Sequence, residues 1–362
     1  MSFSGSYAPE DVEFLLTPIE MPSTPVEERE RLIQSGVRHY SELLAPEPIP
    51  DPEYLDLFQA AFKRNGPRMA RAVASIALRI NSDIPRNPIL VSLVRAGTPV
   101  GVLLHRALLH LGSNSRHYSI SIIRGRGIDT VALDTILDRH PPENIVFVDG
   151  WTGKGAIARE LEQTISQYNQ QRGVQLPDSL TVLNDLAGAA GLTADYDDYL
   201  IPSSILNSIV SGLISRSILN ENYLNPSDFH GCVFYEEKRD MDQSQFFVDQ
   251  LTPSVHQAIT SPDITSAKWP IEKQKEISAK VQNFITEIIK EFDLPDSNRI
   301  KPGIGEATRA VLRRMPERLM LRNNDSNDLK HLSHLANSRN IPIEIRPDLP
   351  FQATVIIQKL GQ

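Results

Sequence analysis

Two loops of this 362-residue chain carry residue types that could bind phosphate groups. The first, Asp149–Gly155, follows the apolar run Ile145–Val148 and precedes a helical pattern. Backbone N–H groups at a helix start donate hydrogen bonds to phosphate, and glycines permit close approach. An acid at the strand end would instead hold sugar hydroxyls. The pattern predicts a ribose 5-phosphate cradle formed by Asp149, Thr152, Gly153, Lys154 and Gly155.

Spacing excludes two commoner phosphate motifs in the first loop. A P-loop needs Gly at position 148 and Ser or Thr at position 155, whereas Val148 and Gly155 stand there. No strand pattern leads into a dinucleotide-binding G-x-G-x-x-G motif. An ordinary Gly-rich turn from strand to helix is the alternative for this loop.

The second loop follows the apolar run Ile89–Val94. Arg95 and the backbone amides of Ala96 and Gly97 could face a diphosphate, with Mg²⁺ rather than a protein-held metal neutralising the remaining charge. The alternative for Arg95 is an exposed arginine at a strand end. Arg124 and Arg126 follow a third apolar run, and a resemblance to a known family, described below, implies that they cover the same diphosphate.

Polar residues further along the chain could hold a second substrate, the acceptor. Asp185 ends another apolar run, and residues 202–218 are rich in serine. At helical spacing they form a polar stripe that includes Ser204, Asn207 and Ser208. We expect a helix here that recognises the acceptor, and a solvated helix face is the alternative.

The elements that must position these loops alternate along the chain. Apolar runs are separated by helical patterns, which predicts an α/β fold with a parallel sheet and helices on both faces. Ligands of such folds bind at the carboxyl ends of the strands. We divide the chain into four parts: an N-terminal arm and helices (1–65), the α/β domain (66–253), a helical connection (254–298) and a small α/β/α domain (299–362).

Composition and charge exclude several classes of protein. With 40% hydrophobic and 23% charged residues, the chain is typical of globular proteins. The single cysteine excludes an internal disulfide and fits a reducing compartment, and we find neither a signal peptide nor a membrane span, so we expect a cytoplasmic protein. The net charge is −8, yet residues 299–362 carry eleven Lys and Arg against six Asp and Glu. The basic C-terminal part favours a polyanionic partner.

The two loops resemble those of type I phosphoribosyltransferases, in that order along the chain. Val148 departs from the pattern, because the family has an acid there. The resemblance implies a Mg²⁺-dependent enzyme that uses phosphoribosyl pyrophosphate (PRPP) to ribosylate a nitrogen acceptor. It implies Asp149, Arg95 and Arg124 as catalytic residues. A PRPP-sensing, RNA-binding regulator without catalysis is the alternative.

Residues 5–294 also resemble the StiP family associated with tellurite resistance and stress, which is described either as cysteine protease or as phosphoribosyltransferase. Three segments carry this resemblance: Gly5–Val12, His39–Glu42 and Asp228–Gly231. A protease would need Cys232 as nucleophile and His230 as base. A buried, inert cysteine is the alternative.

Residues 299–362 resemble a pelota-type RNA-binding domain through Gly303–Arg309 and the Asn340–Pro342 turn. The resemblance implies RNA as a partner, since arginines that contact phosphates dominate such binding. A basic solvated face is the alternative. The candidate RNA-binding residues are Arg309, Arg313, Arg314, Arg318 and Arg322.

Overall fold

The computed structural model describes residues 3–84, 86–268 and 270–359. Its larger sheet has six strands in the order β1-β4-β3-β7-β8-β9, and all neighbouring strands are parallel. The strands are β1 (Glu13–Phe14), β3 (Ile89–Leu93), β4 (Arg116–Ile120), β7 (Ile145–Thr152), β8 (Leu180–Asp185) and β9 (Leu192–Asp195). The predicted α/β class with a parallel sheet is confirmed.

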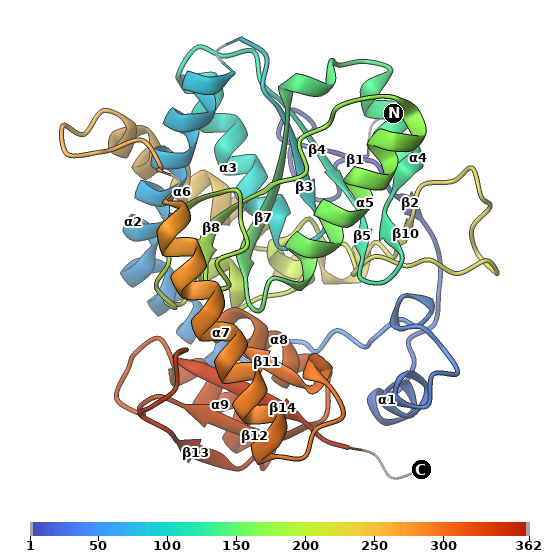
Figure 1. Ribbon diagram of the computed structural model, residues 1–362, viewed down its shortest axis with the longest axis vertical. Helices are drawn as coiled ribbons and strands as arrows, with labels where there is room; N and C mark the ends of the chain where they lie inside the picture. Colours follow the sequence, from blue (N-terminus) through green and yellow to red (C-terminus); the bar gives the residue numbers. More distant parts are fainter. Residues whose placement is uncertain (1–2, 85, 269, 360–362) are drawn as a thin grey trace.

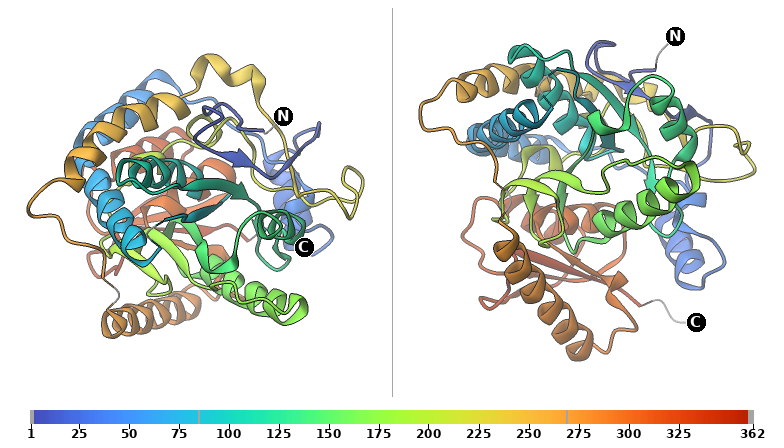
Figure 2. Two further views of the ribbon diagram at one scale, coloured as in Figure 1. Left: turned by 90° about the horizontal axis from the view of Figure 1, so that it is seen from above. Right: turned by 45° about the horizontal axis from the view of Figure 1, so that its top comes forward.

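Helices cover both faces of this sheet (Figures 1 and 2). Strand β3 is buried along its whole length, with Leu90 packed in one apolar cluster and Ile89 and Val91 in another. Strands that carry apolar residues on both faces are typical of parallel sheets that are covered on both sides. One face carries α2 (Pro52–Asp83), α3 (Gly97–His110) and α6 (Ser244–Ile259), and the other carries α4 (Thr130–Leu137) and α5 (Ala156–Arg172).

The C-terminal part is a four-stranded sheet in the order β11-β14-β12-β13. Its elements are α7 (Ile271–Glu291), β11 (Ile300–Pro302), α8 (Ile304–Arg313), β12 (Pro316–Leu321), α9 (Lys330–Ser338), β13 (Ile343–Ile345) and β14 (Ala353–Ile357). Phe284, Ile285 and Ile288 of α7 pack against Met320 and Ile356 of the sheet. Helix α7, all of which lies in the segment that the sequence analysis assigned to a helical connection (254–298), thus covers one face of this sheet.

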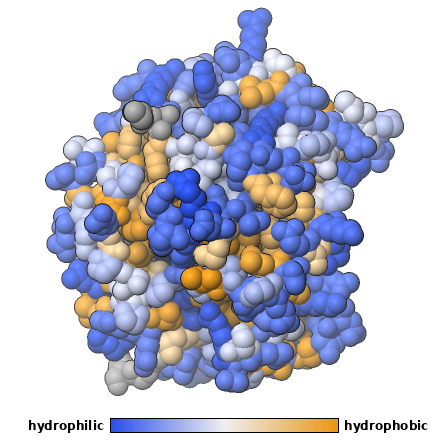
Figure 3. All heavy atoms as spheres, turned by 180° about the vertical axis from the view of Figure 1, so that it is seen from behind, coloured by the Kyte–Doolittle hydropathy of each residue, from blue (hydrophilic) through white to orange (hydrophobic). Residues whose placement is uncertain are grey.

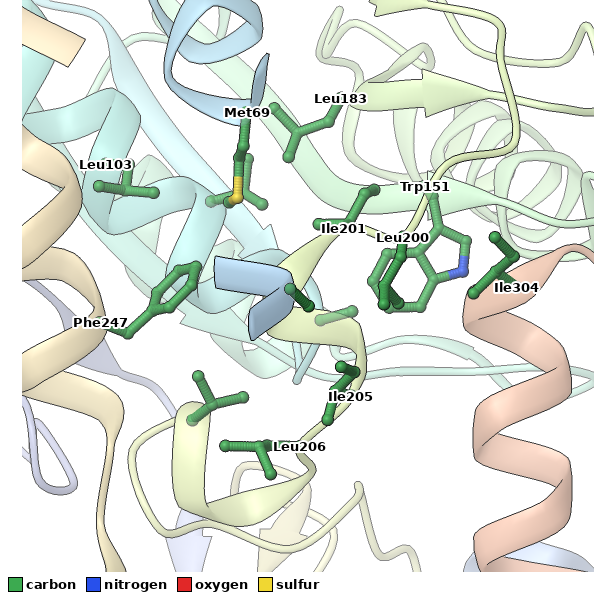
Figure 4. Packing of buried hydrophobic residues seen from close by; sticks show 14 of the residues in the cluster. Met69, Leu103, Trp151, Leu183, Leu200, Ile201, Ile205, Leu206, Phe247 and Ile304 are labelled. Atoms are coloured by element: carbon green, nitrogen blue, oxygen red, sulfur yellow. The ribbon is translucent and has the colours of Figure 1, made fainter. Parts of the chain in front are cut away.

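Helix α8 lies between the two sheets and belongs to a core that they share. Ile304 packs in the same cluster as Trp151 of β7 and Leu200, and Figure 4 shows the Trp151 ring between Leu200 and Ile304. Gly305 makes this contact possible, since a Cβ atom there would lie 2.4 Å from the Trp151 ring. The C-terminal domain therefore packs directly on the carboxyl edge of the parallel sheet.

The N-terminal arm and the segment after β9 wrap around this core. The arm contains β2 (Thr17–Pro18), which pairs with β10 (Gly231–Cys232), and helix α1 (Val26–Gln34). A short hairpin joins β5 (Ile122–Ile123) to β6 (Gly127–Ile128). In Figure 1, α1 lies beside the C-terminal domain and away from α2 and α3, the helices that follow it in the chain.

One expectation about local structure is wrong. The serine-rich segment is no helix: it forms 3-10 turns at Pro202–Ser204 and Ser208–Val210. Its backbone turns sharply at Gly212 and Leu213, which have positive φ. Helix α2, in contrast, runs unbroken through Gly66 and Pro67.

Candidate functional site: a cationic cleft between the two sheets

A cleft of about 1230 Å³ opens between the carboxyl edge of the parallel sheet, α8 and α1. We call it the cationic cleft, because twelve basic residues but only three acidic ones line it. The acids are Asp149, Asp296 and Glu306. The basic residues are Arg29, Arg31, Arg95, Arg124, Lys154, Arg216, Arg299, Lys301, Arg309, Arg313, Arg314 and Lys359. In a chain of net charge −8 this concentration of positive charge marks a site for an anion.

The Gly-rich loop lies at the cleft, and one of its glycines, Gly153, faces the C-terminal domain. A Cβ atom on Gly153 would meet Cγ of Glu306 at 2.6 Å and the carbonyl oxygen of Pro302 at 3.1 Å. The Lys154 ammonium donates a hydrogen bond to the carbonyl of Ser297. The close approach that glycine permits here is thus used by the C-terminal domain.

Asp149 and Thr152 have protein partners in this loop. Desolvation raises the pKa of Asp149 to about 6, and its carboxylate accepts a hydrogen bond from the Gly150 N–H at 2.7 Å. Thr152 donates to the Asp185 carboxylate at 2.6 Å. Asp185 is fully buried and also accepts hydrogen bonds from three backbone N–H groups after β8, those of Ala187, Ala189 and Ala190. It is therefore a structural residue of the loop and not, as predicted, part of an acceptor site.

Arg95 faces Glu47 of the N-terminal arm rather than an open diphosphate site. Its Nη2 donates to Glu47 at 2.6 Å and its Nη1 donates to the Ile214 carbonyl at 2.9 Å. Burial alone would raise the pKa of Glu47, but Arg95 outweighs this effect and the pKa is lowered. Ala96 and Gly97 follow at the start of α3, where Gly97 packs against the backbone of Val148. The positive charge of Arg95 is therefore largely neutralised by Glu47 in this buried ion pair.

Of the other predicted acceptor residues, none lines the cationic cleft. Asn207 accepts a hydrogen bond from Arg313, and Ser208 donates to Glu47 at 3.3 Å. Both line a smaller cavity of about 130 Å³. Ser204 is buried, and its Oγ has no partner within the described residues. Because the segment is no helix, these side chains do not form the expected polar stripe.

The predicted RNA-binding arginines are divided by the fold. Arg309, Arg313 and Arg314 line the cleft, with the Arg309 guanidinium 4.4 Å from the centre of the Trp151 ring. Arg318 and Arg322 lie elsewhere on the domain: Arg318 pairs with Glu317 and Glu344, and Arg322 donates to the Leu349 carbonyl. Neither Arg318 nor Arg322 lines the cleft.

The cleft also contains cations that sequence reasoning missed. Arg29, Arg216 and Lys301 come from α1, the segment after β9 and β11, which are separated by more than 80 residues at each step. Burial and neighbouring cations lower the pKa of Arg29 to about 9 and of Lys301 well below its usual value. No local pattern marks these residues, because only the folded chain brings them together.

Arg124 and Arg126 come from the β5–β6 hairpin. Arg124 lines the cleft, and among the described residues no acid pairs with its side chain. Arg126 instead forms an ion pair with Glu42. The hairpin therefore contributes one of the two expected cations.

Cys232 lacks the surroundings of a reactive thiol. It is fully buried in β10, and burial raises its pKa to about 12. The ring of His230 is hydrogen-bonded to Ser121 Oγ at 2.7 Å through Nδ1, and burial lowers its pKa. A catalytic thiol has the opposite character, namely a depressed pKa and a neighbouring imidazole.

The described residues also bear on metal and membrane binding. Nowhere in 3–84, 86–268 or 270–359 do three or more His, Cys, Asp or Glu side chains gather as a metal would require. Binding of Mg²⁺ stays a prediction. Within the same ranges, none of the helices has the length and apolar character that crossing a membrane demands. Figure 3 shows the back of the molecule, where hydrophobic residues form small groups among hydrophilic ones.

Two family models match the chain. Residues 5–252 match the family described as "Tellurite-like stress resistance cysteine protease StiP", and residues 279–359 match "PELOTA RNA binding domain". A relative from Acinetobacter baylyi named "Cysteine protease StiP" is 42% identical over 99% of this chain and 95% of its own.

Solved structures give a much weaker likeness. Hypoxanthine phosphoribosyltransferase of Trypanosoma cruzi is 18% identical, with a TM-score of 0.28 over 37% of this chain and 81% of its own. Its complex with the product IMP is 15% identical, with a TM-score of 0.24 over 56% and 97%. At these scores the likeness carries no argument about function.

These findings correct the predicted activity. The prediction of an enzyme or sensor that uses PRPP is wrong, because the matching family and the relative that spans the whole chain are both named for a cysteine protease. The predicted RNA-binding likeness of the C-terminal part is supported by the second match, which also includes residues 279–291 of α7.

Proposed function

The chain belongs to the StiP family, and from that premise we propose that it binds RNA in the cationic cleft, between its parallel sheet and its pelota-type domain. The observation that carries the proposal is the excess of twelve basic over three acidic residues around one cleft. RNA carries one negative charge per nucleotide, and neutralising those charges releases counterions.

Single-stranded RNA fits this cleft better than a rigid duplex. The cleft lies between two domains, and residues of α1 also line it, so its walls approach the ligand from several sides. The bases of a single strand can be splayed apart and can stack on guanidinium planes and aromatic rings. Arg216 lies 4.3 Å from the centre of the Tyr40 ring, and both residues line the cleft.

Arg124 and Lys301 allow the clearest test, because no acid pairs with either side chain in the described part of the chain. Replacing each with Gln removes a cation without breaking an internal ion pair. Binding of a fluorescent 12-nucleotide single-stranded RNA would be followed by anisotropy at several salt concentrations. We expect each variant to weaken binding about tenfold at low salt and to reduce the slope of log Kd against log salt by about 0.7.

Two control variants remove the same charge outside the cleft. Arg172→Gln changes an exposed residue of α5, and Arg318→Gln changes an arginine of the pelota-type domain that lies away from the cleft. Both should bind RNA as the wild type does. Equal losses in Arg318→Gln and Arg124→Gln would place RNA on the outer face of the domain and refute binding in the cleft.

Cysteine proteolysis is the second candidate function, favoured by the names of the family and of the relative. Cys232 is the single cysteine of the chain, so it would have to be the nucleophile. Since its thiol is buried with a raised pKa, catalysis would require a rearrangement that exposes β10. Strand β10 pairs with β2, and Gly231 of β10 also forms a bridge with Ile218, so such a rearrangement must break both contacts.

Alkylation tests this second function. We expect iodoacetamide at pH 7.5 to leave the native protein unlabelled and to label it in urea, because a buried neutral thiol is a poor nucleophile. A peptide-library assay with wild type, Cys232→Ser and Cys232→Ala accompanies the labelling. Rapid labelling of the native protein, together with peptidase activity that both variants lose, would establish the protease and contradict the buried state.

A further inference from the structure

Several buried donors at the cationic cleft have no acceptor within the described residues. Ser217 Oγ, Arg29 Nε and Arg313 Nε are all buried without a hydrogen-bond partner, and all three residues line the cleft. The Arg29 and Ser217 residues are 1% and 6% exposed. A buried donor without a partner costs free energy, so such groups occur together where a ligand supplies the acceptors.

Arg29 belongs to a cluster of cations beside α1, and Ser217 follows one member of that cluster along the chain. The Arg29 guanidinium interacts electrostatically with Arg216 and Arg314, and Arg216 is followed directly by Ser217. The cluster thus joins three separate segments: α1, the segment after β9 and the end of α8. Burial, with repulsion among these cations, lowers the pKa of Arg29 to about 9 and of Arg216 to about 10.

The charges of this cluster are only partly balanced. Glu30 is fully buried, forms a two-bond ion pair with Arg314 and lies 3.8 Å from Arg29. The neighbouring acid Glu47 forms an ion pair with Arg95. Three guanidinium groups and one carboxylate leave two positive charges in excess. A group with about two negative charges and several acceptor oxygens would neutralise them and accept from Ser217 and Arg29.

We propose that Arg29, Arg216 and Ser217 form a subsite for a terminal phosphate group of the RNA that the cleft binds. A terminal phosphate carries a charge of about −1.5 to −2 at neutral pH and offers three oxygens, whereas a phosphate within the strand carries −1. Donors as buried as Arg29 and Ser217 suit a group at the end of a chain, because no strand has to continue past it. This inference rests on the proposed function in one respect only: it takes RNA as the molecule that carries the phosphate.

The test compares one RNA sequence with different ends. Three 12-nucleotide RNAs, carrying a 5′-phosphate, a 3′-phosphate or hydroxyl groups at both ends, are titrated by anisotropy at fixed salt. The wild type should bind one of the phosphorylated RNAs about tenfold more tightly than the hydroxyl-ended RNA, as expected for hydrogen bonds to a charged group. In Ser217→Ala and Arg216→Gln this preference should fall below about threefold.

Arg124→Gln is the matched control, since it removes a cation elsewhere in the cleft. It should weaken binding of all three RNAs and keep the preference for the phosphorylated end. Equal wild-type affinity for all three RNAs overturns the subsite and leaves RNA binding intact.

Calorimetry with inorganic phosphate and pyrophosphate separates the two proposals. If no RNA binds, but either anion binds the wild type and loses that binding in Ser217→Ala, the subsite stands with a free phosphate compound as its ligand and the proposed function fails. If neither anion nor any RNA binds, both proposals are refuted.

Discussion

Lys154 is a residue whose charge should respond to pH near neutrality. Desolvation, with repulsion from Arg124, lowers its pKa to about 8. The ammonium attracts an anion only while it is protonated, so RNA affinity should hold below pH 7 and fall as pH rises through 8. The decrease is limited to about tenfold per pH unit for one group.

Lys154→Arg checks this assignment, because arginine keeps its charge above pH 9. Anisotropy titrations at pH 7, 8 and 9 should give a flatter profile for the variant than for the wild type. Lys301, whose pKa is also lowered, can leave some pH dependence in both proteins. Identical profiles would show that Lys154 is not the titrating group.

At the scale of elements, the contact between β7 and α8 decides how the two sheets meet. Gly305 of α8 packs so closely on Trp151 that a Cβ atom would lie 2.4 Å from the ring. Gly305→Ala should therefore force the ring or the helix to move. We expect the free energy of unfolding to fall by about 1–3 kcal/mol, the usual cost of overpacking.

Gly66→Ala is the matched control for this substitution in a helix. Its Cβ atom would meet Leu251 at an ordinary 3.5 Å, and alanine favours the helix over glycine by about 1 kcal/mol. Urea unfolding should show a lower midpoint for Gly305→Ala and an equal or higher one for Gly66→Ala. A midpoint for Gly305→Ala as high as that of the wild type would mean that the domains are not in this close contact.

At the scale of the whole molecule, the shared core predicts one cooperative unfolding transition. Helix α8 packs on β12 and β14 on one side and on Trp151 and Leu200 on the other. Tryptophan fluorescence and far-UV circular dichroism should therefore give coincident urea transitions. Two separated transitions would show that the C-terminal domain is stable without the parallel sheet.

The packing of the C-terminal domain also determines which isolated C-terminal fragment keeps a native-like structure. Residues 299–362 alone would lack α7, whose Phe284, Ile285 and Ile288 cover one face of the sheet of the C-terminal domain. A fragment covering residues 271–362 keeps that helix. Of the two fragments, residues 271–362 should show the more native-like circular dichroism. In both fragments the surface of α8 that packs on Trp151 and Leu200 is exposed.

The sequence by itself determined the fold class and the order of the elements. Runs such as Ile89–Val94, apolar on both faces apart from Ser92, are typical of strands buried between two layers of helices, so local composition already indicates a covered parallel sheet. The separate basic character of residues 299–362 was equally readable, because charge is a property of composition. The Gly-rich turn was expected between a strand and a helix and lies between β7 and α5, but β7 extends to Thr152, and Gly153 faces α8 and β11 of the C-terminal domain.

Only the tertiary structure decided which charged residues come together in the cleft and which are neutralised by an ion pair. Arg95 and Arg314 look alike in sequence to Arg124, yet Glu47 and Glu30 of the distant N-terminal arm neutralise the first two. Arg29, in an acidic and proline-rich arm, became part of the cleft because α1 docks beside α8. Such partners are joined by long-range packing and carry no local pattern, which is why the cleft emerged only when the chain was folded.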